Sequence, residues 1–381
     1  MRREALGEAM DGNFGSAVRA DAASARNLLN AVNGAGEAAT TAWLIYLALA
    51  AYFTVALAGV THKDLLLNTP ITLPILGISV ALDRFFLFAP PFFILIHIGM
   101  MMQFAILMRK AHAFLGVVRA EESEMESGEA GADPVHPLRY ELDGNFLIQF
   151  LAGPPYATVF AIMLQTIVWL TLVMLAAIVL LYFQVAFLPY HDISLTWAHR
   201  LYILADLTLV GLIGTLLTSP VPGFWGSLGY GWRNYAFFML ISTVSFAGFF
   251  AFSYFVATIP GEALDRTLAA IGPSVEVPAP SGMPADAQRV FLPTAYLLEG
   301  QVDTASGTSR SPFQRNLRVM DEDLVKDQGV SPGDVSLSLR YRDLRYARLD
   351  RSDLKQADLT CADLTGASLT GTILTAARRG C

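Results

Sequence analysis

Three polar side chains lie inside long apolar stretches, where their chemistry could matter most. His97 lies midway along one stretch with Gln103 further on, and Asp206 lies in another. Ionisable side chains are costly to place in a membrane and are functional candidates by default. If His97 and Asp206 face one another, they could form a path for protons or ions. The alternative, which we favour, is that each makes one interhelical hydrogen bond that fixes helix packing.

No other pattern in the sequence predicts catalysis. Residues Gly34-Ala-Gly36-Glu-Ala-Ala39 match a G-x-G-x-x-A fingerprint in letters, but that motif needs a preceding strand, and residues 24–32 have a helical pattern. The run Gly226-Ser-Leu-Gly229 lacks the first glycine of a nucleophile elbow, because Trp225 occupies that position. We therefore predict no catalytic residue, no cofactor and no metal.

The composition predicts the surroundings in which these side chains would act. Hydrophobic residues make up 54% of the chain and charged residues 15%, and the mean hydropathy is +0.46. These values are typical of an integral membrane protein, whose spanning helices each need roughly 17 to 25 apolar residues. Five stretches approach or reach that length: Thr41 to Val60, Phe85 to Met108, Ala157 to Phe187, Leu201 to Thr218 and Ala236 to Ile259. The fourth is the weakest, because it is short and contains Asp206.

Lysine and arginine in the short loops predict the orientation, because cytoplasmic loops are enriched in both. With five spans, nine such residues fall on the side of the N-terminus: Arg2, Arg3, Arg19, Arg26, Arg109, Lys110, Arg119, Arg139 and Arg233. Three fall on the other side: Lys63, Arg84 and Arg200. This difference favours a cytoplasmic N-terminus. Five spans would then place the C-terminal tail in the periplasm, whereas losing the fourth span would return it to the cytoplasm.

The C-terminal tail contains a repeat of fixed period. Leucine recurs every five residues, a period that fits neither a helix nor a strand. The eight leucines are Leu339, Leu344, Leu349, Leu354, Leu359, Leu364, Leu369 and Leu374. A small residue precedes most of them by two positions, including Ala347, Ala357, Ala362 and Ala367. Short fixed periods are typical of solenoids, in which each repeat covers the core of its neighbour.

Residues 337–376 resemble the pentapeptide-repeat proteins, as the run Ala-Asp-Leu-Thr-Cys-Ala-Asp-Leu-Thr-Gly illustrates. The resemblance implies a right-handed, four-sided β-helix in which the leucine and the small residue point inward. Leu337 and Arg342 depart from the small residue, so we expect an irregular first coil.

The fold class that we predict is an α-helical transmembrane bundle of about five spans followed by this small β-helix. Residues 1–40 form a cytoplasmic segment, and 41–260 form the multi-pass membrane domain. Residues 261–336 form a linker and a cap for the solenoid, and 337–376 form the pentapeptide-repeat β-helix. Two cysteines, Cys361 and Cys381, are too few to indicate a disulfide framework or a redox compartment.

These features predict a protein that acts by interaction. The resemblance implies a bacterial inner-membrane protein that uses its solenoid to bind a protein partner or to form a homo-oligomer. The expected contact surface is an arginine patch on the first coil: Arg340, Arg342, Arg345, Arg348 and Arg351. Some proteins of this family imitate DNA with an acidic surface, but residues 339–381 contain eight basic residues and five aspartates. We therefore expect no nucleic-acid role. The alternative function is a channel or transporter that the solenoid regulates or assembles.

Overall fold

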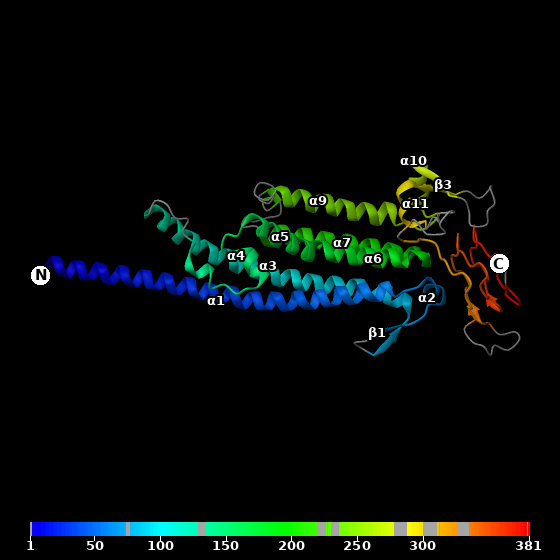
Figure 1. Cartoon of the computed structure of the whole chain (residues 1–381), viewed down its shortest axis with the longest axis horizontal. Helices are drawn as coiled ribbons and strands as arrows, with labels where there is room; N and C mark the ends of the chain where they lie inside the picture. Colours follow the sequence, from blue (N-terminus) through cyan, green and yellow to red (C-terminus); the bar gives the residue numbers. More distant parts are fainter. Residues whose placement is uncertain are drawn as a thin grey trace. The chain divides into compact units, whose positions relative to one another are not determined.

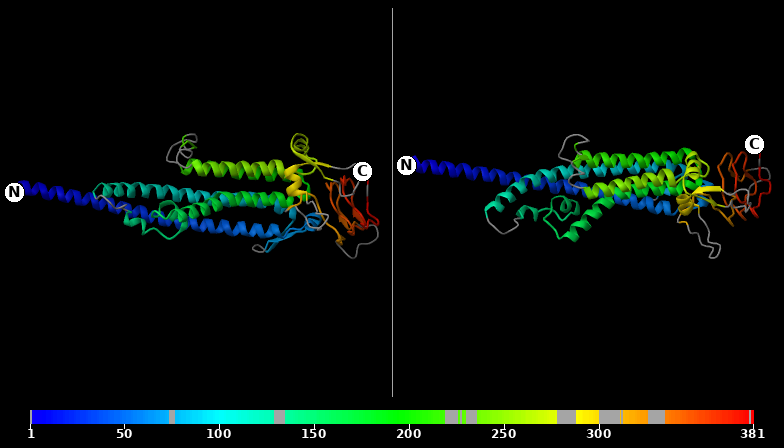
Figure 2. Two further views of the ribbon diagram at one scale, coloured as in Figure 1. Left: turned by 45° about the horizontal axis from the view of Figure 1, so that its top comes forward. Right: turned by 90° about the horizontal axis from the view of Figure 1, so that it is seen from above.

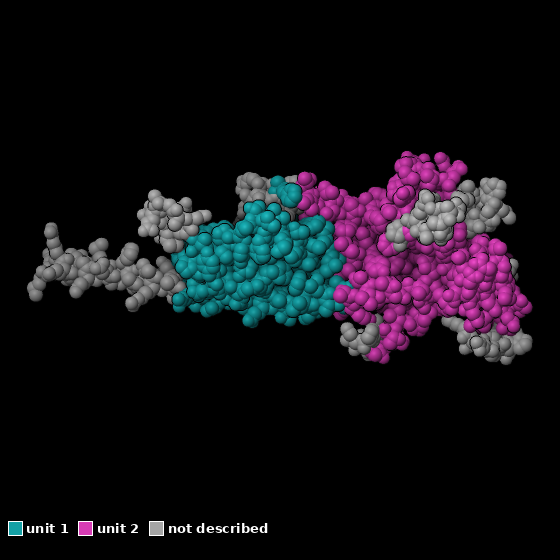
Figure 3. Space-filling model, in the orientation of Figure 1, with its two compact units in different colours: residues 1–50, 95–176, 208–239 teal, residues 51–94, 177–207, 240–381 magenta. Residues whose placement is uncertain are grey.

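The computed structural model describes residues 2–73, 77–128, 135–218, 226, 228–229, 236–277, 288–299, 311, 313–325, 335–378 and 380–381. Figure 1 shows the elements in chain order. The chain divides into two compact units, which Figure 3 colours separately. The first comprises Met1–Ala50, Leu95–Ala176 and Thr208–Met239, and the second comprises Ala51–Ile94, Ala177–Leu207 and Leu240–Cys381.

Four helical stretches among the described residues are long and apolar enough to cross a membrane. They are Ser24–Ala58, Leu82–Ser123, Thr158–Tyr190 and Met239–Val256. Each overlaps one of the five stretches predicted from the sequence. A membrane domain is therefore compatible with the structure, but the prediction of five spans is wrong.

The predicted stretch that is not among these four is the fourth, Leu201 to Thr218. It is helical, and it forms most of α7 (Ile193–Thr218). However, α7 also contains His199 and Arg200, and Asp206 follows one and a half turns later; all three side chains are buried in protein. A buried charge requires partners that lipid cannot supply, so these three side chains indicate that this part of α7 contacts protein.

The first unit contains most of α1 (Arg2–Ala58) and α3 (Leu82–Gly128). Two short helices, η1 (Pro137–Arg139) and α4 (Phe146–Ala152), precede α5 (Thr158–Trp169), which begins the next long stretch. Asn145 caps α4 by accepting from the Leu147 N–H, and its amide donates to the Gly36 carbonyl of α1 at 3.1 Å. A Cβ at Gly36 would lie 2.2 Å from Ile148. Gly36, which belongs to the G-x-G-x-x-A match in the sequence, thus lies where α4 packs closely on α1.

A π-helical segment, η2 (Leu170–Met174), joins α5 to α6 (Leu175–Phe187). In the second unit, the 3-10 turn η3 (Leu188–Tyr190) connects α6 to α7. The helix α9 (Ala236–Ala251) ends in a second π-helical segment, η4 (Phe252–Val256). Phenylalanine rings pack between the helix ends of this unit, with Phe183 in edge or tilted contact with Phe53, Phe85 and Phe86.

Short elements join these helix ends to the repeats. The helix α2 (His62–Leu67) begins with a capping box made by Thr61 and Asp64, and β1 (Ile71–Leu73) pairs antiparallel with β2 (Ile78–Val80). After η4 come α10 (Ala263–Ile271), the antiparallel pair β3 (Ser274–Val277) and β4 (Gln288–Phe291), and α11 (Leu292–Leu298). All of these elements belong to the second unit.

The repeats form stacked parallel coils, which Figure 2 shows in two further views. The strands β5 (Leu337–Ser338) and β6 (Ala357–Asp358) pair in parallel, and single bridges continue the stacking. The bridges are Asp343 with Asp363, Arg348 with Ser368, Asp353 with Ile373 and Asp358 with Arg378. Every one of these pairs is 20 residues apart, so one coil contains four pentapeptides.

An earlier segment covers this stack on one side. Arg318 pairs with Arg348 and Asp323 pairs with Asp353, again in parallel. The residues of each pair are 30 positions apart in the sequence, ten more than the length of one coil. Residues 326–334, between the two segments, lie outside the described range. Leu317, Val319 and Leu324 are buried beneath these bridges. Residues 313–325 therefore contribute a further layer before the first leucine of the repeat.

Each pentapeptide ends in a corner where one residue has a left-handed backbone, with φ between 56° and 72° from Tyr341 to Ala376. An aspartate before the leucine stabilises the corner by accepting the N–H two residues on, as Asp363 does from Thr365 at 3.0 Å. At Gly366 a Cβ would lie 2.6 Å from the Tyr346 ring. Glycine is therefore needed at position 366, because its backbone is left-handed and because a side chain would collide with Tyr346 of the preceding coil.

The predicted core leucines differ in burial. Leu339, Leu344, Leu349, Leu354 and Leu359 are at most 3% exposed, and Ala347 and Ala357 are fully buried. Leu364, Leu369, Leu374, Ala362 and Ala367 are half-buried. The inward positions of the earlier coils thus form a core, and those of the later coil leave part of their apolar surface uncovered by the described chain.

Candidate functional site

The contact between the repeats and the helix ends begins at the turn between α6 and α7. His191 follows η3 in a left-handed conformation and donates its N–H to the Leu188 carbonyl. Its side chain is buried, and its Nε2 lies 2.9 Å from the Arg315 carbonyl, which can only accept, so this nitrogen carries the hydrogen. The other ring nitrogen, Nδ1, lies 3.5 Å from Asp343 of the repeats. One histidine therefore joins three segments of the chain.

Asp343 is held as a carboxylate by this arrangement. Burial raises its pKa, but the neighbouring His191 and the hydrogen bonds from Arg345 outweigh burial and leave the pKa below its usual range. The Arg345 guanidinium donates to Asp343 Oδ2 at 2.5 Å. The carboxylate thus lies between a cation on its own coil and the buried turn between α6 and α7.

Arg342 explains why the first coil departs from the repeat pattern. It stands where later repeats have alanine, and its guanidinium lies 3.8 Å from the centre of the Tyr190 ring. Such a stacked cation is attracted by the ring face, and more strongly when water is excluded. We call Tyr190, His191, Arg315, Arg342 and Asp343 the helix–repeat junction. All five residues lie in the second unit.

A buried arginine connects the helix–repeat junction to α10 and to the end of α11. Arg315 is fully buried and forms ion pairs with Asp265 of α10, at 2.7 Å, and with Glu299 after α11. Asp265 also accepts from the Thr258 hydroxyl and the Gly261 N–H. Burial lowers the pKa of Arg315, but the two carboxylates outweigh burial and raise it. We call Arg315, Asp265 and Glu299 the Arg315 cluster.

A second buried arginine holds the end of α9. Arg200 of α7 is fully buried, and its guanidinium forms a two-pronged ion pair with Glu262 at 2.5 and 3.2 Å. It also donates to the carbonyls of Ser253 and Ala257, which the π-helical end of α9 leaves available. Gln184 of α6 donates to the same two carbonyls at 2.9 and 3.2 Å. Helices α6, α7 and α9 are therefore joined by buried polar contacts.

The helix α2 contacts the segment that covers the repeats. His62 Nδ1 accepts the Arg318 N–H at 3.0 Å, and Lys63 forms an ion pair with Glu322 at 2.7 Å. An accepting nitrogen must be unprotonated. Burial, and secondly the Arg318 cation, lower the pKa of His62 to about 4.

This histidine predicts a pH dependence of stability. In the unfolded chain His62 binds a proton below its ordinary pKa of 6.5, whereas in the folded chain it does so only near 4. The unfolded state therefore binds more protons between these values, and stability is full above pH 6.5 and falls as the pH falls towards 4. We expect the melting temperature of the detergent-solubilised protein to drop by several degrees between pH 7 and 4.5. In His62→Asn, which keeps an acceptor but cannot titrate, the drop should be smaller; equal drops would contradict this role.

The polar residues predicted inside the membrane have different surroundings. His97 is buried in the first unit, its Nε2 lies 2.9 Å from the Leu172 carbonyl of η2, and its ring stacks on Tyr46. This contact is the kind of interhelical hydrogen bond expected if His97 serves helix packing and not ion conduction. Gln103 is half-buried in the same unit, and Asp206 is buried in the second. The idea that His97 and Asp206 face one another stays a prediction.

The predicted arginine patch is divided among separate contacts. Arg345 is paired with Asp343, and Arg351 with Asp321 at 2.5 Å. Arg342 is stacked on Tyr190, while Arg340 is exposed and lies 3.8 Å from Asp358. Arg348 is half-buried beside Arg318. These cations are therefore largely engaged within the protein.

Sequence reasoning missed the residues of the two buried ion-pair groups. Arg200 was visible as a cation at the start of an apolar run, which is an expensive position and therefore a signal. Glu262, Asp265, Glu299 and Arg315 lie in segments of ordinary polarity and carried no signal. Among the residues that the structure describes, no group of three His, Cys, Asp or Glu side chains is placed to hold a metal ion.

Comparison with known proteins identifies one part of the chain. Residues 343–375 match the family of pentapeptide repeats, in eight copies. The match covers the stacked coils described above and a small part of the whole chain. Neither a curated protein nor a solved structure matches the chain.

Proposed function

We propose that the protein is a multi-pass membrane protein that presents its pentapeptide repeats as a protein-interaction or oligomerisation module. The helix–repeat junction carries the proposal. Arg342 stacks on Tyr190, and His191 contacts both Arg315 and Asp343, so the repeats are fixed to the helix ends by buried polar contacts. A fixed orientation lowers the entropy that a binding module loses when it meets its partner.

We further propose that the repeats form a right-handed, four-sided β-helix. Two observations support this architecture: paired segments recur after 20 residues, and a left-handed corner recurs every five. Such a domain offers four sides for contact. The proposal assigns the protein no catalytic activity, no cofactor and no nucleic-acid partner.

A photo-crosslinking experiment tests the interaction. A photoreactive amino acid is placed in the full-length protein at one exposed position on each side: Arg340, Lys355, Thr365 and Thr370. Irradiation of living cells should give a product from one or two sides, identified by mass spectrometry as a second copy or as another protein. Leu44, which is 54% exposed on a candidate span, is the control position that faces lipid. Absence of a product from all four sides of a folded protein would refute the proposal.

The proposed location is a bacterial inner membrane with a cytoplasmic N-terminus, supported by the excess of basic residues near the N-terminus. His62 and Lys63, which follow the first candidate span, contact Arg318 and Glu322 of the segment that covers the repeats. The third and fourth candidate spans end beside one another, because Gln184 contacts Ser253. If the first span crosses the membrane, these contacts favour a tail on the side opposite the N-terminus, which is the periplasm. Protease added to spheroplasts should therefore reach the repeats before the membrane is lysed; complete protection until lysis would contradict this orientation.

The rival function is conduction of an ion or solute by the helices. The buried side chains of His97 and Asp206 favour it, because ionisable groups in apolar helices are costly. Flux in liposomes that is lost in both His97→Ala and Asp206→Ala would replace our proposal with this one. His97→Gln provides a matched control, because its amide can still donate to the Leu172 carbonyl while it cannot exchange a proton near neutral pH.

A further inference from the structure

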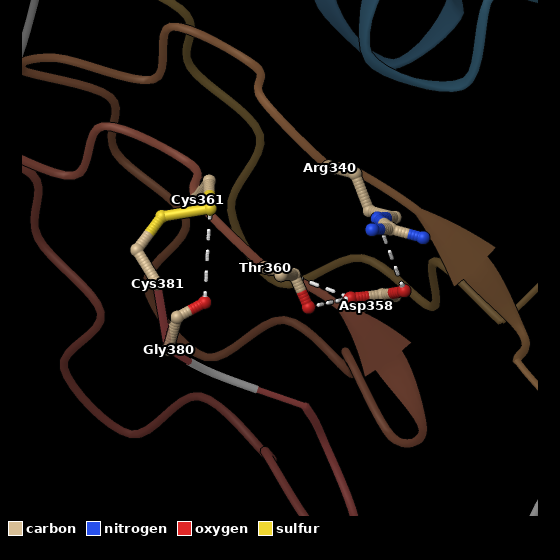
Figure 4. The surroundings of a disulfide bond; sticks show 6 residues. All are labelled: Arg340, Asp358, Thr360, Cys361, Gly380 and Cys381. Atoms are coloured by element: carbon tan, nitrogen blue, oxygen red, sulfur yellow. Dashed lines mark hydrogen bonds and ion pairs between the residues drawn. A yellow bond between two sulfur atoms is a disulfide. The ribbon is translucent and has the colours of Figure 1, made fainter.

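The two cysteines are separated by the length of one coil of the repeats. Cys361 and Cys381 are 20 residues apart, which is the length of one coil, and their Cα atoms are 5.0 Å apart. This distance lies within the range that a disulfide requires. The structure joins them in a disulfide bond, drawn in Figure 4. The chain has no other cysteine, so the only alternatives are two free thiols or bonds between copies.

The disulfide reinforces a small number of backbone contacts. Around it, Leu359 donates to the Arg378 carbonyl at 2.9 Å, Arg378 donates to the Ala357 carbonyl at 2.9 Å, and Cys361 donates to the Gly380 carbonyl at 3.2 Å. Arg378 is exposed, and no side chain of residues 376–378 or 380–381 is fully buried. Segments with exposed hydrogen bonds and little buried apolar surface open most easily. The covalent bond is therefore the strongest constraint on this segment.

The surroundings also allow chemical exchange. Cys381 is exposed and Cys361 is half-buried at a corner, so a small thiol or disulfide can reach the sulfur atoms. Accessible disulfides exchange with dissolved thiols, whereas buried ones do not. Exposed disulfides are more easily reduced than buried ones, and regulatory disulfides are found among them.

We propose that Cys361 and Cys381 form a redox-reversible cross-link that holds the segment after Leu374 onto the coil before it. Its reaction partner is a small disulfide or thiol of the glutathione class. In the forming direction, the Cys381 thiolate attacks glutathione disulfide and releases one glutathione thiolate. The Cys361 thiolate then attacks the Cys381 sulfur of the mixed disulfide and releases the second. The protein dithiol is oxidised, glutathione disulfide is reduced, and the two thiol protons pass to the two glutathione molecules.

This cross-link deepens the proposed function, on which its biological role rests. The segment after Leu374 adjoins the half-buried Leu364, Leu369 and Leu374. Oxidation keeps the edge of this apolar surface next to Leu374 closed, and reduction allows the segment after Leu374 to open. The redox state would thus control how much of the repeat module is available for contact.

The test uses the purified full-length protein in detergent, equilibrated with mixtures of reduced and oxidised glutathione. Thiols are counted by mass after alkylation, and opening is measured as the rate of tryptic cleavage after Arg378. We expect an intramolecular disulfide in oxidising mixtures and two thiols in reducing mixtures, with cleavage at least about tenfold faster in the reduced form. The Cys361→Ser/Cys381→Ser variant keeps both residues nearly isosteric and should be cleaved quickly in every mixture.

Four results would overturn the cross-link: thiols that stay free in pure glutathione disulfide, a disulfide between two copies, a bond that resists pure reduced glutathione, or equal cleavage of both forms. None of these depends on a partner or on the side of the membrane. Photo-crosslinking at Thr370 in oxidised and reduced protein then tests the link to function. Absence of a product in both states would count against the proposed interaction and would leave the cross-link standing.

Discussion

Leu359→Asp is expected to unfold the pentapeptide repeats while the membrane helices stay folded. Leu359 is 3% exposed and lies between coils, where the side chains around it are apolar. An ionised carboxylate without a partner in such a core costs roughly 3 to 5 kcal/mol, and the leucine contacts are lost as well. Limited proteolysis of the full-length protein should show the repeats digested while fragments of the helices persist.

Two matched variants make this result specific. Thr375→Asp introduces the same charge at an exposed position next to a leucine of the same series, with Ile373 and not an aspartate two residues before it, and should leave protease resistance nearly unchanged. Leu374→Asp replaces a half-buried leucine of the same series and should have an intermediate effect, because part of its side chain already contacts solvent. Equal resistance of all three proteins would show that the leucines do not point inward.

Arg315→Met is expected to destabilise the second unit by roughly 3 to 5 kcal/mol, because the change leaves the carboxylates of Asp265 and Glu299 buried without their cation. The His191 contact uses the backbone carbonyl of residue 315, so it does not require the arginine side chain. The thermal melting temperature of the solubilised protein measures the effect. A shift of less than about 2 °C would contradict the buried ion pairs.

The variant Arg315→Met/Asp265→Asn/Glu299→Gln separates charge from packing. It removes the cation and both buried anions, and ion pairs replaced as a set by neutral groups often cost little. We therefore expect it to recover most of the stability lost in Arg315→Met. Arg351→Met is the control for an exposed pair: its partner Asp321 is in solvent, and exposed pairs contribute little.

The periodic features of this chain were predictable because each depends on local residue order. A leucine every five residues requires a turn every five residues, whatever lies around it, and the short parallel bridges follow. Long apolar stretches likewise predicted the helices around His97 and Phe53. The fourth stretch, in α7, is not among the candidate spans, and hydropathy did not show that its Asp206 and the preceding Arg200 are buried in protein.

The junction between helices and repeats was not predictable, because its partners are distant in sequence. Arg200 and Glu262 are 62 residues apart, and Tyr190 and Arg342 come from segments with no common pattern. A buried charge is stable only where the fold brings it an opposite charge or free carbonyls. The partners of the arginine patch were not predictable for the same reason: Arg345 pairs with Asp343 and Arg351 with Asp321, and the role of the patch as a contact surface stays a prediction.

The sequence by itself determined that the chain has apolar helices and a five-residue repeat, because both are periodic consequences of which residues follow one another. Only the tertiary structure decided which polar groups hold the parts together. Whether a charge pairs, and whether Cys361 meets Cys381, depends on the distance between residues after the coils have stacked. That distance is set by how the coils and helices of the second unit pack together.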